Sequence, residues 1–181
     1  MLSRTSAIIL FLFLAVCLPY QAPVFASGFI DNYVDTIPHR PEPPILLQDA
    51  SGQTLNLKDF RGRFILLNLW TSWCAPCVSE MPSLDALQKK LGGENFTVIA
   101  LNEEHDGTIV AKNFYNRYGI QSLGIYSDPS GRGIGLVLAR GLPVTLLINA
   151  QGNEIGRVNG DTDWDSPEAI ALIKSAMAAA P

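Results

Sequence analysis

Two cysteines separated by two residues, Cys74 and Cys77, are the side chains whose types and spacing point most directly to chemistry. They follow a short apolar run from Phe64 to Trp70, which is typical of a buried strand. Beyond Cys77 the apolar residues recur at helical spacing, so the pair is expected where a strand ends and a helix begins. Free N–H groups and partial positive charge at a helix N-terminus lower the pKa of a thiol and make its thiolate a usable nucleophile. Because only two residues separate them, the sulfurs can close a disulfide, and one can attack a partner that the other releases.

The first 26 residues are typical of an export signal. Residues 7 to 18 form an unbroken apolar stretch, which is long enough for the core of a signal peptide and short for a membrane span. Val24-Phe25-Ala26 supplies the small residues of a cleavage site. We expect residues 1–26 to be a signal peptide, with an uncleaved N-terminal membrane anchor as the alternative. A lipoprotein at Cys17 is disfavoured, since Val16 is bulky where such sites have a small residue.

Cleavage after Ala26 would leave Cys74 and Cys77 as the only thiols. A disulfide between residues three apart closes a tiny ring, for which chain entropy gives roughly 2 kcal/mol of stability. A structural staple would be better placed between distant elements, so redox chemistry is favoured. Zinc is disfavoured because it requires about four ligands. Only His39 and His105, both expected at the surface, could assist the two thiolates.

Length, composition and charge narrow the class further. A chain of 181 residues with 48% hydrophobic residues is expected to form one globular domain with a substantial core. The net charge is −4, and cleavage would leave 12 basic and 17 acidic side chains, a net charge of −5. An acidic chain argues against nucleic acid as a partner. The sequence contains neither a dinucleotide-binding fingerprint nor a metal-binding motif, so we expect no cofactor.

The hydrophobic pattern predicts an α/β domain over residues 45–181. A small hairpin is expected from residues 45 to 57, followed by strands and helices in the order βαβα and then ββα. The main expected strands are 64–70, 96–101, 144–148 and 154–158, and the expected helices are 75–91, 108–118 and 166–178. Strands joined by helical crossovers should be parallel and the late hairpin antiparallel, which gives a mixed sheet with helices on both faces. Residues 27–44, which include a proline-rich stretch from Pro38 to Pro44, are expected to form an extended linker.

The residues around the two cysteines resemble the active site of the thioredoxin superfamily. The likeness covers about residues 42–177 and is greatest to the exported, membrane-associated thiol–disulfide reductases of the TlpA/ResA type. The matching residues are Asn68-Leu69-Trp70-Thr71-Ser72-Trp73-Cys74-Ala75-Pro76-Cys77, Glu80-Met81-Pro82, Gly141-Leu142-Pro143-Val144-Thr145, and Gly160 with Trp164-Asp165-Ser166. The resemblance implies a thioredoxin-like fold with an N-terminal hairpin and a central insertion. It also implies a Cys74–Cys77 disulfide and disulfide reduction outside the cytoplasm.

Substrate contacts are implied by the same resemblance. Trp73 and Pro76 are expected to contact the substrate. The peptide before Pro143 is expected to be cis and to lie beside the disulfide. This geometry would leave the backbone groups of Leu142 free to pair with an extended substrate.

Two positions depart from the superfamily pattern. Thioredoxin carries a buried Asp on its central strand where this chain has Asn68, and an amide cannot shuttle a proton. Glu80, one helical turn beyond Cys77, is the candidate replacement, as in ResA-like proteins, because residues at i and i+3 share a helix face. The alternative is that Glu80 is an ordinary surface residue. The second departure is residues 138–141, which are shorter than the corresponding stretch of the cytochrome c maturation reductases and weaken assignment to that branch.

The resemblance implies a function in cytochrome c maturation or in assembly of the copper site of respiratory oxidases. Cys74 would attack the substrate disulfide, and Cys77, deprotonated with help from Glu80, would release the reduced substrate. The expected partners are disulfide-containing proteins and an integral-membrane thiol transporter as electron donor, and the expected location is the bacterial periplasm. Two alternatives stay open: a copper-binding assembly protein on the same fold, and an oxidant that forms disulfides.

Overall fold

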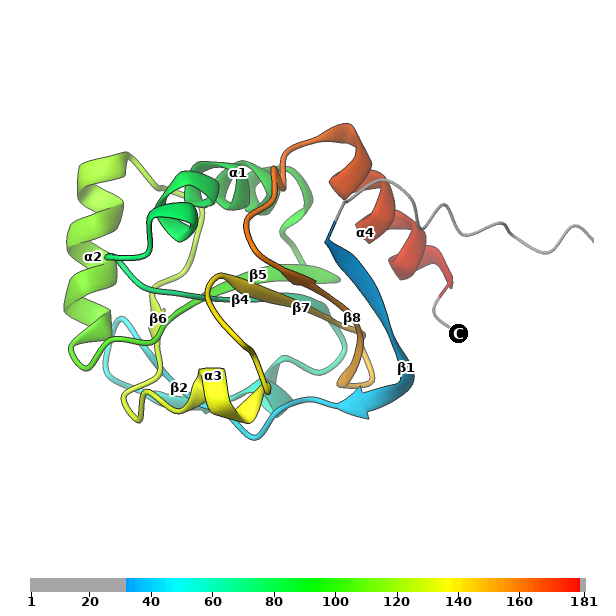
Figure 1. Ribbon diagram of the computed structural model, residues 1–181, viewed down its shortest axis with the longest axis horizontal. Coiled ribbons are helices and arrows are strands. Elements are labelled where there is room, and N and C mark those ends of the chain that lie inside the picture. Colours follow the sequence, from blue (N-terminus) through cyan, green and yellow to red (C-terminus); the bar gives the residue numbers. More distant parts are fainter. Residues whose placement is uncertain (1–31, 180–181) are drawn as a thin grey trace, which may run out of the picture.

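The structure, a computed structural model, describes residues 32–179. These residues form one eight-stranded sheet with the strand order β1-β8-β7-β4-β5-β6-β2-β3. The strands are β1 (Tyr33–Pro41), β2 (Leu46–Asp49), β3 (Thr54–Asn56), β4 (Phe64–Trp70), β5 (Phe96–Asn102), β6 (Tyr126–Ser127), β7 (Val144–Ile148) and β8 (Asn153–Asn159). The helices are α1 (Ala75–Leu91), α2 (Gly107–Tyr118), α3 (Gly133–Leu136) and α4 (Pro167–Ala179), with a 3₁₀ turn at Leu57–Phe60. The predicted mixed α/β fold is confirmed, with β6 and α3 supplied by the central insertion between α2 and β7 (Figure 1).

The sheet buries side chains on both faces. Every residue of β4 is buried, as expected for a central strand covered on two sides. One face packs against α1, α2 and α4 in a cluster that contains Trp70, Cys77 and Trp164. The other face packs against α3, β2 and the 3₁₀ turn in a cluster that contains Leu67 and Leu146. The predicted arrangement, with helices on both faces of the sheet, is confirmed and explains this two-sided burial (Figure 1).

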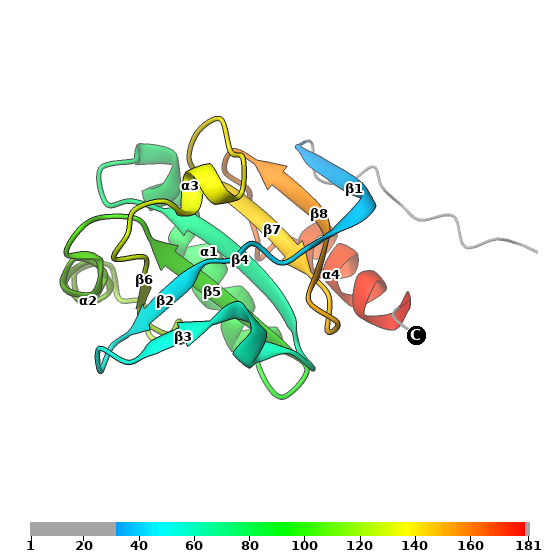
Figure 2. The ribbon, with the colours of Figure 1, turned by 90° about the horizontal axis from the view of Figure 1, so that it is seen from below.

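Strand directions agree with the predicted connections. β4 pairs with β5, and β5 with β6, in parallel, because helical crossovers join them. β7 pairs antiparallel with both β4 and β8, and β2 and β3 form the predicted antiparallel hairpin. This hairpin lies at the opposite edge of the sheet from β1 (Figure 2).

The linker expected over residues 27–44 is wrong for Tyr33–Pro41, which forms β1 and pairs antiparallel with β8. Proline lacks an N–H group, so it is tolerated only at the edge of a sheet or where pairing is interrupted. β1 satisfies both conditions, since it is an edge strand and its register shifts between Asp35 and Arg40. The domain therefore begins before residue 45, and the proline-rich stretch joins the sheet at its edge.

The remaining expectations about the N-terminus, including the signal peptide or anchor of residues 1–26, lie outside the described residues. Within residues 32–179, the helices are too short or too polar to cross a membrane.

Candidate active site

Cys74 and Cys77 form a disulfide at the beginning of α1, with their Cα atoms 5.2 Å apart. Cys74 is the N-cap residue, and its Sγ accepts a hydrogen bond from the Cys77 backbone N–H at 3.3 Å. Pro76 occupies the first turn, where a missing N–H removes no helical hydrogen bond. Cys77 is fully buried, whereas Cys74 is 6% exposed. The predicted junction of strand and helix is confirmed, and Cys74 is the more exposed of the two cysteines.

The loop before Cys74 is held by a residue that sequence analysis missed. Glu104, just after β5, accepts hydrogen bonds from the Ser72 backbone N–H at 2.6 Å and from the Ser72 hydroxyl at 3.0 Å. Asn102 Nδ2 donates to the same carboxylate at 3.1 Å. The only available signal was that parallel strands end at a common edge of the sheet, so that residues after β5 lie near residues after β4.

Glu80 lies in the core one turn beyond Cys77, with only 3% of its surface exposed. Its carboxylate accepts hydrogen bonds from Asn68 Nδ2 at 2.6 Å, Trp164 Nε1 at 3.1 Å and the Thr162 backbone N–H at 3.2 Å. The alternative of an ordinary surface glutamate is therefore wrong. Burial raises the pKa of Glu80 to about 7, although these hydrogen bonds oppose the shift.

Asn68 connects Glu80 to the neighbouring strand. Its Nδ2 also donates to Thr145 Oγ1 on β7 at 2.9 Å, and the register pairs these two residues directly. Thr145 and Trp164 match the family pattern in sequence, but that pattern does not indicate a contact with Glu80. The structure places both in the polar network around its carboxylate.

The Leu142–Pro143 peptide is cis, as the resemblance implied. Leu69 near the end of β4 pairs with Val144 at the beginning of β7. Pro143 therefore lies beside the end of β4 from which the chain continues to Cys74. Leu142 packs against the core cluster that contains both cysteines. Trp73, by contrast, projects into solvent and is 74% exposed.

His39 and His105 are both exposed. Within residues 32–179, the His, Cys, Asp and Glu side chains form no group of three or more that could hold a metal ion.

The Redoxin family matches residues 22–173 of this sequence. The chain belongs to the Redoxin family. It is 32% identical over 119 residues to the thiol-disulfide oxidoreductase ResA of Bacillus thuringiensis strain Al Hakam, a match that covers 66% of this chain and 68% of that protein. The protein of the same name from Halalkalibacterium halodurans is 33% identical over 131 residues, covering 71% and 73% of the two chains.

Solved structures show the same fold. A protein described as a thiol:disulfide interchange protein DsbE, from Chlorobium tepidum, has a TM-score of 0.67 and 26% identity, covering 77% of this chain and 96% of that one. The exposed lipoprotein thioredoxin of Streptococcus pneumoniae has a TM-score of 0.60 and 25% identity, covering 72% and 97%. This Redoxin-family chain, with its Cys74–Cys77 disulfide, is a thioredoxin-superfamily protein of the ResA/TlpA type. It is a thiol–disulfide oxidoreductase of the protein-disulfide reductase class.

Proposed function

We propose that the chain reduces disulfides of exported partner proteins, with Cys74 as the attacking thiol. The observation that carries this proposal is the position of Cys74 at the N-cap of α1, where its Sγ accepts the Cys77 N–H. Such a position stabilises a thiolate. The Cys74 thiolate attacks one sulfur of the substrate disulfide, forms a mixed disulfide and expels the other substrate sulfur as a thiolate.

Cys77 completes the exchange. Its thiol loses a proton with help from Glu80, attacks the Cys74 sulfur and releases the second substrate thiolate. Two electrons pass to the substrate, and the protein is left with the Cys74–Cys77 disulfide. Glu80 suits the proton transfer because it lies one turn from Cys77 and burial raises its pKa to about 7.

A variant in which resolution is blocked tests these roles. Cys77→Ser should accumulate mixed disulfides between Cys74 and substrate proteins, which mass spectrometry can identify after acid quenching. Cys74→Ser, the matched control, should form none. If alkylation by a small reagent near neutral pH is lost in Cys77→Ser and kept in Cys74→Ser, the two roles are reversed.

The cellular role we propose is cytochrome c maturation or assembly of the copper site of an oxidase, in the periplasm. A signal peptide or N-terminal anchor would deliver the chain there, and a membrane thiol transporter would return electrons to it. Supporting observations are the apolar residues 7–18 and the names of relatives such as ResA, DsbE and the exposed lipoprotein thioredoxin.

The direction of exchange in the cell is tested by trapping thiols in growing cells. We expect Cys74 and Cys77 to be mainly reduced, with a potential closer to about −270 mV than to about −120 mV. A value above about −180 mV on equilibration with glutathione would instead favour the alternative, a disulfide-forming oxidant.

Copper binding on the same fold is the second alternative. Tight stoichiometric binding of copper by the reduced protein, lost in Cys74→Ser, would favour it. Under the reductase proposal copper binding is weak, and Cys74→Ser abolishes disulfide reduction.

A further inference from the structure

A groove lies beside the Leu142–Pro143 peptide. Its volume is about 690 Å³, within the range of sites that hold ligands. Three segments that are distant in sequence line it: β1, the loop between α3 and β7, and β8. Because Leu69 pairs with Val144, the Pro143 end of the groove lies beside the end of β4 from which the chain continues to Cys74.

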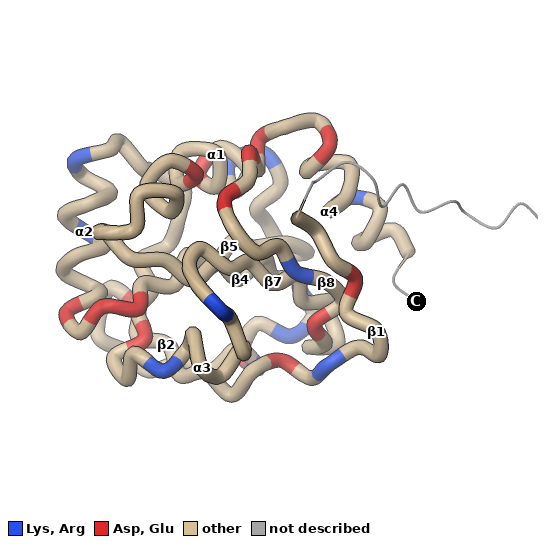
Figure 3. The backbone as a smooth tube through the Cα atoms, in the orientation of Figure 1, with Lys and Arg blue, Asp and Glu red and all other residues tan. Residues whose placement is uncertain are grey.

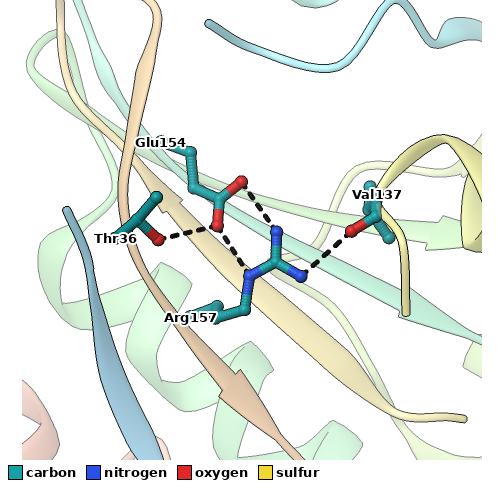
Figure 4. Close-up of polar contacts among 4 residues, drawn as sticks. All are labelled: Thr36, Val137, Glu154 and Arg157. Carbon is teal, nitrogen blue, oxygen red and sulfur yellow. Dashed lines mark hydrogen bonds and ion pairs between the residues drawn. The ribbon is translucent and has the colours of Figure 1, made fainter. Parts of the chain in front are cut away.

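A partly buried ion pair between Arg157 and Glu154 fixes the walls of the groove relative to one another (Figure 4). Arg157 Nε and Nη2 donate to the Glu154 carboxylate at 2.7 and 2.8 Å, and Arg157 Nη1 donates to the Val137 carbonyl at 3.0 Å. Thr36 Oγ1 on β1 donates to the same carboxylate at 2.8 Å. The pair therefore joins β1, β8 and the end of α3. Walls held in this way lose little conformational freedom when a partner binds, which favours affinity.

Large apolar side chains are concentrated at this groove. Val34, Ile37 and Leu138 line it and are 57%, 83% and 74% exposed, and they are three of the eight large apolar side chains that residues 32–179 leave exposed. Leu138 also has a φ of 56°, which is the left-handed region that a bulky residue rarely adopts. Such a conformation is costly, and residues that adopt it cluster at active sites and ligand-binding segments.

The groove is also locally basic in an acidic protein. Arg40 and Arg140 line it, and neither belongs to the ion pairs of the described residues. The charge of Arg157 is neutralised by Glu154, which lies behind the lining, and Asp35 supplies the one carboxylate among the lining residues. The net charge of the chain is −4, so this region differs in sign from the protein as a whole. Figure 3 shows a basic residue on the loop between α3 and β7, whereas acidic residues gather between β8 and α4.

We propose that this groove binds the substrate segment next to the reactive disulfide, and that the segment is extended and carries one apolar and one acidic side chain. The apolar side chain packs on Ile37 and Leu138, and the acidic side chain pairs with Arg140 and Arg40. The occupant is a substrate because the groove is continuous with the Leu142–Pro143 peptide at the disulfide end of the sheet. The proposal rests on the proposed reduction by Cys74 and adds to it the chemistry of the substrate.

The test uses the pre-reduced full chain in single turnover with synthetic peptides. Each peptide has one cysteine in a mixed disulfide with 5-thio-2-nitrobenzoate, whose release is coloured, and a leucine and a glutamate near that cysteine. Further peptides carry glutamine or lysine in place of the glutamate. In each series the leucine and the charged residue stand either before or after the cysteine. One of the two placements, before or after the cysteine, should be favoured. For that placement we expect the glutamate peptide to reach half-maximal rate at a concentration about tenfold lower than the lysine peptide needs.

Charge reversal in the groove should invert this preference. Arg140→Glu should favour the lysine peptide over the glutamate peptide, with a smaller change in the maximal rate. Arg117→Glu on α2, outside the groove, makes the same change of charge and should keep the wild-type preference. If Arg140→Glu and Arg117→Glu show the same preference between the two peptides, the groove does not discriminate by charge and the proposal fails.

Leu138 provides an independent test, because Asn tolerates the left-handed region. Leu138→Asn should fold with unchanged or higher stability, yet raise several-fold the concentration of leucine peptide needed for half-maximal rate. An unchanged concentration would contradict the apolar contact.

Failure of this inference can be told from failure of the proposed function. If wild type does not reduce cysteine carrying the same dye, the reductase proposal fails. If it reduces all the peptides equally well, only the groove proposal fails. A dimer that Arg140→Glu dissociates would make a second copy of the chain the occupant and would also overturn the groove proposal.

Discussion

Glu80 and Glu103 are two buried glutamates whose pKa values burial raises to about 7, yet their surroundings differ. Both oxygens of Glu80 accept hydrogen bonds, from Asn68, Thr162 and Trp164. Glu103, just after β5, accepts one at Oε2 from the Ile134 N–H at 3.2 Å, and its Oε1 has no partner among the described residues. The nearby Asp128 carboxylate contributes to the raised pKa of Glu103 by repulsion.

The difference shows that a raised pKa does not identify a proton-transfer group by itself. Glu80 lies on α1 one turn from Cys77, where a proton can serve the exchange. Glu103 and Asp128 instead bind backbone N–H groups at the beginning of α3, so they position the central insertion. We therefore propose proton transfer for Glu80 and a structural role for Glu103.

Glu80→Gln should have the largest effect. Removing the base should slow resolution of the mixed disulfide by a factor of about 10² or more, while the first attack by Cys74 changes less. Rapid-quench measurement of both steps across pH 5–9 checks this. Glu103→Gln is the matched control and should leave the resolution step unchanged. Overlapping resolution profiles for wild type and Glu80→Gln would show that another group moves the proton.

The pH dependence of stability should report the raised pKa values of both glutamates. With pKa values raised from 4.5 to about 7, the folded protein binds more protons than the unfolded chain in that interval, so the free energy of unfolding falls as pH rises through 7. Glu80→Gln should remove roughly 2 kcal/mol of the fall between pH 5 and 8. Glu103→Gln should remove a similar fall, because burial raises the pKa of Glu103 to the same value of about 7. Urea titrations at both pH values measure this, and equal pH slopes in wild type and Glu80→Gln would contradict the raised pKa.

The smallest effect concerns the packing of Glu103 against α3. A Cβ at Gly133 would overlap the Glu103 carboxylate, whereas a Cβ at Gly135 has open space. Gly133→Ala should therefore lower the free energy of unfolding by about 1 kcal/mol, and Gly135→Ala should leave it nearly unchanged. The pH profile of resolution should be unaffected in both. If Gly133→Ala also slows resolution, the central insertion and the Glu80 network are coupled.

Local sequence patterns predicted the elements and the reactive pair. The apolar run of β4, the helical spacing after Cys77 and the hairpin of β2 and β3 each depend on neighbours in sequence, and each was found where expected. The edge strand β1 was missed because its pairing with β8 joins residues more than a hundred positions apart, and its prolines suggested a linker.

The sequence by itself determined the chemistry that can occur: two thiols at the beginning of a helix, with a carboxyl group one turn further along the same helix. These relations are local, since helix geometry fixes the positions of residues three apart. Only the tertiary structure decided that Glu80 is buried. Two of its three hydrogen-bond partners, Asn68 and Trp164, are 12 and 84 residues away in sequence. The raised pKa of Glu80 and the groove beside Pro143 exist because the sheet brings distant segments together, and no periodicity in the sequence encodes those contacts.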